Sequence, residues 1–383
     1  MMTYIIRRLL AMVPALLGIA TITFALMHIP RGGPFTTEHP NAAVTAALNA
    51  KYHLDEPVWP TFLGPGSDIY RYAVLGLAIA LIAGAYIASK RWGTAVTVIR
   101  SLMYTVAGIM VFWFILMITQ EPGTSGDVGF VAGQYLRYLG GLVQGDLGTS
   151  FSFPGRPVVD IIGASARNSF ILGITAFGIL VAVAIPLGIL AAVKQNTWID
   201  YVATGVSLVG YSIPNFVLGV LFILVFGLWL NLIPIAQWRE FPRDLILPAI
   251  VLAIRPMAVL TRLTRASMIE VLNQDYIRTA WAKGLGSRMV LIRHALRNAL
   301  LPVVTVMGDH LGDLITGSIV VEYLFGIAGI GQWFVTSVQS RDYGVIMGVT
   351  LFYATLVLFI NLVVDLLYSV IDPRIRLGGA SRS

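Results

Sequence analysis

The sequence predicts an all-α membrane protein with about eight transmembrane helices, and its composition and its apolar runs are the observations that predict it. Hydrophobic residues make up 57% of the 383 residues and charged residues only 12%, whereas an average soluble domain carries roughly a quarter charged residues. So few charges cannot cover the surface of a soluble protein. Runs approaching the roughly 20 residues that cross a bilayer as a helix lie at residues 9–29, 69–88, 102–118, 170–193, 206–230, 245–260, 300–320 and 345–371.

The first run, at residues 9–29, is predicted to be an uncleaved helix. It is longer than the apolar core of a typical signal peptide, and no small-residue cleavage site follows it. Like the other runs it is expected to be helical, because only helices and closed β-barrels satisfy the backbone inside lipid. A barrel would show short alternating segments instead of solid apolar runs.

The second and third runs are joined by Lys90 and Arg91, which predicts a cytoplasmic turn between them. Over the whole chain, placing the N-terminus in the cytoplasm puts most Lys and Arg on the inner side and most Asp and Glu outside. We therefore expect both termini to be cytoplasmic. The formal net charge of +7 is spread over separate loops, which favours anchoring at the inner leaflet over nucleic-acid binding.

A single long inner loop lies between the sixth and seventh runs, and it is helix-prone and basic. On a helix, Tyr276, Ala280 and Gly284 fall on one stripe, where the small residues would let another surface approach the backbone closely. Lys283 and Arg288 add cations that could pair with carboxylates of a partner. The pattern fits docking into a partner's groove, and it equally fits a solvated helix held at the membrane surface by its cations.

The seventh run carries Asp309, His310 and Asp313, and acidic residues inside hydrocarbon are costly and normally face a bundle interior or a water-filled cavity. Asp309 and Asp313 stand four residues apart on one helical face. They could present negative charge to a cationic substrate group along a translocation path, or offer ligands to a divalent metal. In the structural alternative, one of them pairs with Arg255 of the sixth run. The sequence leaves these readings open.

No catalytic constellation is visible in the sequence. A nucleotide-binding P-loop requires Gly-Lys before Ser or Thr, and no Gly-Lys pair occurs. The histidines are scattered without the spacing of a metalloprotease, and the absence of cysteine excludes thiol catalysis and Cys-based metal sites. We therefore expect a chain that is not an enzyme and that holds no metal or cofactor of its own.

The inner loop also carries a resemblance to a known family. Residues 275–285, DYIRTAWAKGL, and residues 293–302, RHALRNALLP, resemble the signature loop of ABC-importer permeases in the form found in the dipeptide, oligopeptide and nickel permease family. The general loop begins with Glu-Ala-Ala, three residues and Gly, whereas here RTA occupies 278–280 and Gly284 keeps the glycine. HALR at 294–297 replaces the usual Ile-x-Leu-Pro. Both departures are habits of the peptide and nickel branch.

Other segments resemble the same family in the same order along the chain, so the resemblance covers most of it. Where the family usually has Pro-Gly-x-Gly, this chain has AGIG at 328–331. The segments are YIIRRLL at 4–10, QYLRYL at 134–139, GDLGTS at 145–150, YSIPNF at 211–216, EYLF at 322–325, RDY at 341–343 and DPRIR at 372–376.

The resemblance implies a transmembrane permease subunit of an ABC importer, with a core of six helices, in the cytoplasmic (inner) membrane of a bacterium or archaeon. It implies that a second, homologous permease completes the translocation path for peptides or a related small solute. An extracytoplasmic binding protein would deliver the substrate, and two cytoplasmic ATPase subunits would hold ATP and Mg²⁺. The ATPase-docking residues would be Tyr276, Ala280, Lys283, Gly284 and Arg288.

An insertion is also predicted. In the family a Leu-Asp-x-Pro stretch runs almost directly into Gln-Tyr-Leu-Arg-Tyr-Leu, but here residues 58–133 separate the two. We therefore expect a first helix and outer segment in 1–57, an inserted helical hairpin in 58–133, and the permease core in 134–383 with its docking loop at about 267–298. The alternative function is a secondary transporter driven by an ion gradient, which would usually supply its own coupling charges inside the membrane.

Overall fold

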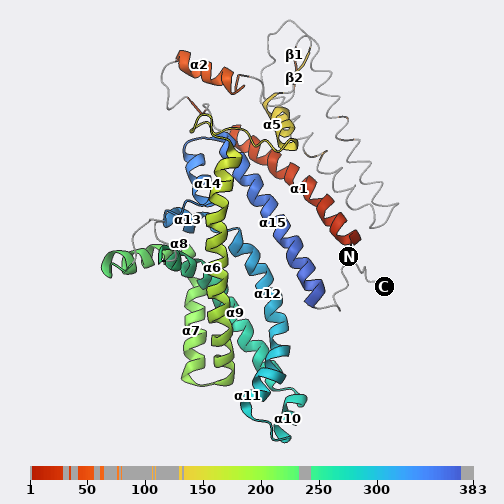
Figure 1. The fold of residues 1–383 in the computed structure, drawn as a ribbon, viewed down its shortest axis with the longest axis vertical. Coiled ribbons are helices and arrows are strands. Elements are labelled where there is room, and N and C mark those ends of the chain that lie inside the picture. The colour runs from red at the N-terminus through yellow and green to blue at the C-terminus, as the bar shows by residue number, and fades with distance from the viewer. Residues whose placement is uncertain are drawn as a thin grey trace. The chain divides into compact units, whose positions relative to one another are not determined.

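In the computed structural model of the chain, the described residues are 2–28, 34–35, 42–55, 61–63, 76, 79, 106, 108, 129–131, 133–232 and 243–371. The chain divides into two compact units. Unit 1 comprises Met1–Gly163, Thr336–Leu358 and Leu377–Ser383, and unit 2 comprises Ala164–Val335 and Phe359–Arg376. Helices dominate the described part of both units (Figure 1), which confirms the predicted helical class.

Unit 1 joins the first helix to a short helix far along the sequence. The hydroxyls of Thr21 and Tyr135 form a hydrogen bond of 2.6 Å, and the ring of Phe24 packs edge-on against the Tyr135 ring. The described elements of this unit are α1 (Met2–His28), α2 (Ala42–Lys51), β1 (Thr61–Leu63), β2 (Gly129–Val131), α5 (Gly133–Val143), the first residues of α6 (Val158–Val193), the last residues of α14 (Ile330–Gln339) and the part of α15 (Tyr343–Ile371) that precedes residue 359.

A buried carboxylate holds the loop that follows α5. Asp342 accepts hydrogen bonds from the Ser150 hydroxyl, from the N–H groups of Phe151 and Ser152 at 3.1 Å, and from the N–H of Val345 at 3.3 Å. Several donors of this kind compensate a carboxylate for its burial. Two segments that resemble the permease family, 192 residues apart in the sequence, are therefore fastened together.

Unit 2 is a bundle of helices with one main apolar core. Leu172 of α6, Leu260 of α9 and Val303 of α12 are fully buried in it. The described elements of this unit are most of α6 (Val158–Val193), α7 (Trp198–Ser212), α8 (Asn215–Phe222), the π-helix η2 (Ile223–Trp229), α9 (Arg243–Leu272), α10 (Asp275–Ala282), α11 (Ser287–Met289), the π-helix η3 (Val290–Leu296), α12 (Arg297–Ile315), α13 (Ile319–Leu324), the start of α14 (Ile330–Gln339) and the part of α15 from residue 359 onward.

An ion pair fastens the turn between α6 and α7 to α9. Both carboxylate oxygens of Asp200 accept hydrogen bonds from the guanidinium of Arg265. The Asp200 side chain also accepts the N–H of Asn196 at 3.0 Å, in a turn where Asn196 adopts a φ of +60°. This two-point contact is the geometry in which arginine binds a carboxylate most strongly.

Five described helices are long and apolar enough to cross a membrane, or six if a bent pair counts as one span. The five are Arg8–His28, Val158–Val193, Asp244–Leu272, Ser287–Ile315 and Tyr343–Leu366. This result confirms a membrane protein with several apolar helices. The total of about eight spans and the cytoplasmic position of both termini stay predictions.

Two predicted spans have different bounds in the structure. The run at 206–230 is not one continuous helix, because α7 and α8 with η2 are bent by 104° at the break that contains Pro214. Proline lacks a backbone N–H and disfavours the helical conformation in the residue before it, and Ile213 is accordingly extended. The seventh run, predicted at 300–320, belongs to a span at Ser287–Ile315.

The predicted inserted hairpin lies outside the described residues, apart from a few single helical positions. At the ends of the insertion, β1 pairs antiparallel with β2, so that Thr61 lies opposite Val131 and Leu63 opposite Gly129. The chain segments at the two ends of the insertion therefore lie side by side. The hairpin itself stays a prediction.

Candidate translocation path and docking loop

A cavity of about 350 Å³ in unit 2 brings together polar side chains of four helices. It contains two of the predicted path residues, His310 and Asp313, and Asp309 is their neighbour on α12. The cavity, called the membrane pocket below, is lined by Tyr211, Asn215, Leu252, Arg255, Pro256, Val259, His310, Asp313 and Leu314. The structure thus gathers the charges of α9 and α12 at one site.

The acidic side chains of α12 lie on the surface of the subunit. Asp309 and Asp313 are exposed, and His310 is half-buried with an Nε2 atom that has no hydrogen-bond partner among the described residues. All three belong to the span Ser287–Ile315, where a carboxylate facing lipid would be costly. This face of α12 must therefore be covered by water or by another protein.

Arg255 contributes a cation to the same pocket. Its guanidinium lies 5.3 Å from the centre of the Tyr211 ring, and Arg262 lies 5.0 Å from the same ring, so the tyrosine is flanked by two cations. Within the described part of the chain, no ion pair joins Arg255 to Asp309 or Asp313. The translocation-path role and the pairing with Arg255 both stay predictions.

A metal site needs several donor atoms that converge on one point. In the ranges that the structure describes, no group of three or more His, Cys, Asp or Glu could hold a metal ion. The translocation-path reading needs only charges that face a cavity, and Asp313 and Arg255 line one.

The docking loop turns Ala280 inward. Ile277 and Ala280 of α10 are buried in a small core with Met268, Val290 and Ala295, and the Ala280 side chain is only 5% exposed. At Ala280 the structure therefore corrects the expected outward stripe. The small side chain lets α10 pack closely on this unit's own helices, and a contact of Ala280 with a partner has no support in this geometry.

Gly284 is required by the backbone. Its φ is +74°, a left-handed conformation that favours glycine. The Gly284 N–H donates to the Trp281 carbonyl at 2.9 Å and the Leu285 N–H to the Ala280 carbonyl at 3.4 Å, an arrangement typical of a helix that ends at glycine. A Cβ at Gly284 would meet nothing within 4 Å, so space remains there for a partner.

The outward surface of the loop is basic and partly apolar. Tyr276 is exposed, and its hydroxyl accepts a hydrogen bond of 2.8 Å from the Asn298 side chain, which fastens α10 to α12. Lys283 and Arg288 are exposed, and neither forms an ion pair within the residues described. We name the exposed side chains of this loop the docking surface, after the role predicted for it, and they are Tyr276, Trp281, Lys283, Arg288, Met289 and Ile292.

Glu322 of α13 is a buried carboxylate that the sequence marked only as part of a family-like segment. Its Oε2 accepts the N–H of Gly331 at 2.7 Å in the first turn of α14, and Ser169 and the N–H of Gln332 also donate to the carboxylate. Burial nevertheless raises the pKa of Glu322 to about 7, because loss of hydration penalises the charged form more than these hydrogen bonds favour it.

The same carboxylate shapes the AGIG turn. A Cβ at Gly329 would collide with Glu322 Oε2 and Ser169 Oγ, so only glycine fits there. The N–H of Ile330 donates to Ser169 Oγ at 2.9 Å. The start of α14 is therefore fixed by side chains from α6 and α13, although Ala328 stands where the family usually has proline.

Comparisons with known proteins show which proteins the chain is similar to. Residues 184–377 match the family described as binding-protein-dependent transport system inner membrane component. The chain is 37% identical over 378 residues to the dipeptide transport system permease protein DppB of Bacillus subtilis (strain 168), covering 98% of this chain and 99% of that protein. It is 45% identical over 251 residues to the oligopeptide transport system permease protein AppB of the same organism, covering 63% and 79%.

A solved structure of the MetNI methionine ABC transporter, in an inward-facing conformation, is also similar to the chain. The TM-score is 0.48 and the sequence identity 15%, and the match covers 56% of this chain and 97% of that one.

Proposed function

The chain belongs to the family of binding-protein-dependent transport system inner membrane components, and from this premise we propose that it carries short peptides as the permease subunit of an ATP-driven importer. The family makes the chain a transport permease. Its cargo is proposed from the relatives, which are named as dipeptide and oligopeptide permeases. The ion-gradient alternative has no support from these relatives.

The observation that carries the proposal is the presence of both a cation and an anion in the lining of the membrane pocket. Arg255 and Asp313 both line it, and a free peptide carries an ammonium group at one end and a carboxylate at the other. Arginine suits a carboxylate because its planar fork can donate two parallel hydrogen bonds. An aspartate suits an ammonium group because its carboxylate carries the opposite charge and accepts hydrogen bonds. A pocket with both signs therefore fits a zwitterionic peptide.

The exposure of the α12 carboxylates fits a path shared with a second subunit. Asp309 and Asp313 face outward from the subunit within a membrane span, and intramembrane charges normally face a protein interior or a water-filled cavity. A second, homologous permease would close this face and leave the charges around an aqueous path.

The docking surface is proposed to receive a cytoplasmic ATPase subunit, which supplies ATP and Mg²⁺. Its exposed Trp281, Met289 and Ile292 offer apolar contact, and Lys283 and Arg288 offer charge. A short helix with this mixture suits a groove in a partner protein. An extracytoplasmic binding protein completes the proposed assembly, in the cytoplasmic membrane of a bacterium.

Reconstitution tests the proposal directly. We expect vesicles with the assembled permease pair, ATPase and binding protein to take up a radiolabelled dipeptide only when ATP is supplied, and ionophores that collapse proton or sodium gradients to leave uptake unchanged. Uptake by the isolated chain driven by an ion gradient would make it a secondary carrier instead.

A further inference from the structure

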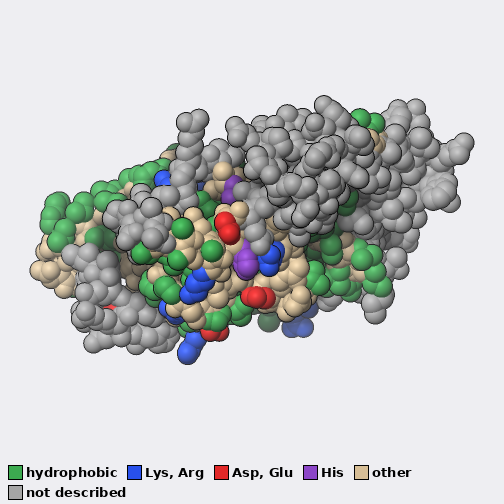
Figure 2. Space-filling view, turned by 90° about the horizontal axis from the view of Figure 1, so that it is seen from above, with side chains coloured by type: hydrophobic (Ala, Val, Ile, Leu, Met, Phe, Trp, Pro, Cys, Tyr) green, Lys and Arg blue, Asp and Glu red, His purple; other side chains and the backbone are tan. Residues whose placement is uncertain are grey.

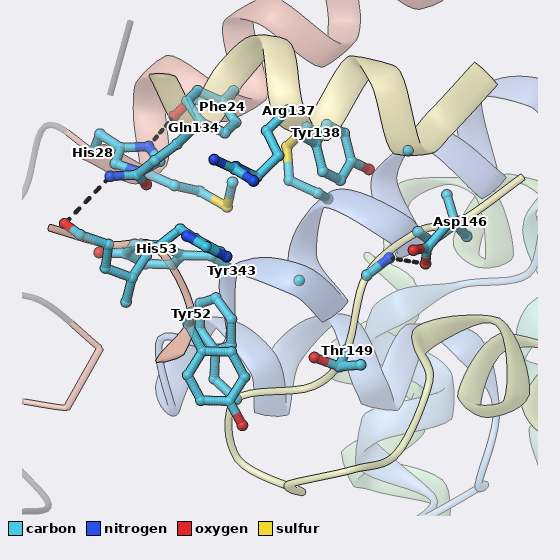
Figure 3. Close-up of a pocket in the computed structure, with 18 of the residues that line it drawn as sticks. Phe24, His28, Tyr52, His53, Gln134, Arg137, Tyr138, Asp146, Thr149 and Tyr343 are labelled. Atoms are coloured by element: carbon cyan, nitrogen blue, oxygen red, sulfur yellow. Dashed lines mark hydrogen bonds between the residues drawn. The ribbon is translucent and has the colours of Figure 1, made fainter. Parts of the chain in front are cut away.

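A second cavity, of about 320 Å³, lies within unit 1 and shares no residue with the membrane pocket or the docking surface. It is formed where the end of α1, the end of α2, α5, the loop after α5 and the start of α15 meet (Figure 3). We call it the outer pocket, because the predicted topology places this end of α1 outside the cytoplasm. Its volume falls within the range of about 300–1,000 Å³ that is typical of small-molecule sites.

Aromatic rings form one wall of the outer pocket. The rings of Tyr52 and Phe151 lie 4.9 Å apart between centres, and the ring of Phe151 lies 6.1 Å from that of Tyr343. Met27 and Met347 add flexible apolar surface to the lining. This wall suits an apolar or aromatic side chain of a ligand, because such rings bury a large apolar area in a defined geometry.

Positive charge lines the same cavity. Lys51 and Arg137 are exposed, and both line the pocket. In Figure 3 the Arg137 side chain reaches over the cavity between Gln134 and Tyr138. Asp146 is the only acidic residue among the described lining residues, and its carboxylate accepts the N–H of Gly148 at 2.8 Å. The lining therefore favours an anionic group near Arg137 and Lys51.

On one face of the molecule, Figure 2 shows His, Lys or Arg, and Asp or Glu side chains gathered in a small area amid uncharged surface. The view looks onto the end where Figure 1 shows α2 and α5, the elements that supply Lys51 and Arg137.

Tyr138, which lines the pocket, carries a hydroxyl with no hydrogen-bond partner among the residues that the structure describes. This hydroxyl is buried. Burial raises the pKa of Tyr138, and the charge of Asp146 raises it further, so the phenol stays neutral at physiological pH.

The walls are held in place before any ligand arrives. The Gln134 side chain donates to the Leu54 carbonyl at 3.3 Å and forms a second hydrogen bond of 3.3 Å with His28, so it joins α1, α5 and the segment after α2. Asp342 fixes the residues around Phe151. Walls held in this way reduce the entropy that a ligand must overcome on binding.

Three segments that resemble the permease family far apart in the sequence meet at this cavity. The segment 134–139 supplies Arg137 and Tyr138, the segment 145–150 supplies Asp146, and the segment 341–343 supplies Tyr343. No sequence motif joins them. Their meeting at one cavity is a property of the fold.

We propose that the outer pocket binds the carboxylate end of a short peptide, with Arg137 and Lys51 around the carboxylate and the rings of Tyr52, Phe151 and Tyr343 around the last side chain. The inference rests on the proposed function, since it takes peptides as the cargo. It adds a receiving site on the permease itself, separate from the membrane pocket. A peptide enters it through its free C-terminus.

Photo-crosslinking in the assembled transporter, in lipid nanodiscs and without the binding protein, tests this site. The probe is a dipeptide of alanine and benzoylphenylalanine, compared with the same dipeptide as its C-terminal amide. We expect the free acid to label the segments around Tyr52, Phe151 or Tyr343, and the amide to label them about tenfold less, because a hydrogen bond to a charged group is lost.

Variants make the assignment specific. Arg137→Gln is expected to lower labelling by the free acid about tenfold and to leave labelling by the amide unchanged. Arg156→Gln removes another exposed arginine of unit 1 that does not line the pocket, and labelling should match that of the unchanged chain. Three outcomes would each overturn the site. They are equal labelling by acid and amide, labelling confined to other segments, and loss of labelling when anionic phosphatidylglycerol is present in the nanodisc.

ATP-dependent uptake of unlabelled dipeptide, measured on the same preparation with the binding protein restored, separates the two proposals. Uptake that persists while the outer pocket is never labelled overturns the site and leaves peptide transport standing. Absence of uptake for every peptide overturns the proposed function and the site with it.

Discussion

Glu322 is the residue whose burial has the clearest consequence for stability. A glutamate normally titrates near 4.5, and here its pKa is raised to about 7. Between these values the unfolded chain loses its proton while the folded chain keeps it, so the folded state binds more protons and stability falls as pH rises. The difference between the pKa values of Glu322 in the unfolded and folded chain corresponds to about 3 kcal/mol in the free energy of unfolding, which is lost between pH 4.5 and 7.

Glu322→Gln should remove this dependence, because a glutamine keeps an acceptor for the Gly331 N–H but does not ionise. We expect the melting temperature of the variant to exceed that of the unchanged protein by more at pH 8 than at pH 5. Tryptophan fluorescence during heating in detergent measures the difference. An identical difference at both values would show that Glu322 does not titrate in this range.

At the scale of elements, the ion pair of Asp200 with Arg265 is expected to hold α7 and the α6–α7 turn to α9. Asp200 is buried and Arg265 half-buried, so Asp200→Ala leaves a poorly hydrated cation behind. We expect a loss of about 2 kcal/mol, below the 3–5 of a fully buried pair because solvent screens the arginine.

A matched control for this pair lies in α10. Asp275 and Arg278 form an ion pair at 3.6 Å with both side chains highly exposed, and exposed pairs contribute little. Asp275→Ala should therefore leave the unfolding midpoint almost unchanged in the same denaturation experiment. Equal effects of the two substitutions would contradict the structural role of Asp200.

The docking loop has its own element-scale prediction. Trp281 is 44% exposed on α10, so Trp281→Ala should leave folding intact and weaken association with the ATPase subunit about tenfold, as expected for an aromatic contact at an interface. Co-purification of the ATPase and peptide-stimulated ATP hydrolysis measure the effect. Trp198→Ala removes another exposed tryptophan, outside the loop, and should change neither.

Two substitutions of Gly284 separate its role in the backbone conformation of the docking loop from a role in contact with a partner. Gly284→Asn retains a residue that tolerates the left-handed conformation, whereas Gly284→Trp adds bulk where the structure leaves open space. We expect Gly284→Trp to uncouple ATP hydrolysis from transport and Gly284→Asn to retain most coupling. Normal transport by the tryptophan variant in the assembled complex would exclude Gly284 from the docking contact.

At the scale of the whole molecule, the membrane pocket predicts which peptides pass. Asp313→Asn should lower uptake of a dipeptide with a free amino group about tenfold and leave an N-acetylated dipeptide unaffected, because the lost charge faced the ammonium group. Arg255→Gln should likewise lower uptake of a dipeptide with a free carboxylate and leave uptake of the C-terminal amide unaffected. Glu270→Gln, exposed on α9 outside the pocket, serves as the control.

A structural role for these charges would give a different result. If Asp313→Asn destroyed the folded protein and the added change Arg255→Gln restored it, the two residues would form a buried pair in the assembled transporter. Uniform loss of uptake for free and capped peptides would also exclude a role in recognising peptide ends.

The sequence by itself determined the membrane class, the approximate positions of the described spans and the family. These features can be recognised in continuous stretches of sequence. A run of apolar residues long enough to cross lipid is a local property, and the signature loop is one continuous segment. Local reasoning also located Asp309, His310 and Asp313, because a charge inside an apolar run is visible without a fold.

Only the tertiary structure decided which side chains face inward and which distant segments meet. Ala280 turned inward because α10 packs on the helices beside it. Proline predicts a break near residue 214, but the angle of 104° is known only from the structure. Glu322 is buried, and the outer pocket exists, because segments far apart in the sequence fold together. Burial depends on such long-range contacts, and no local pattern of residues encodes them.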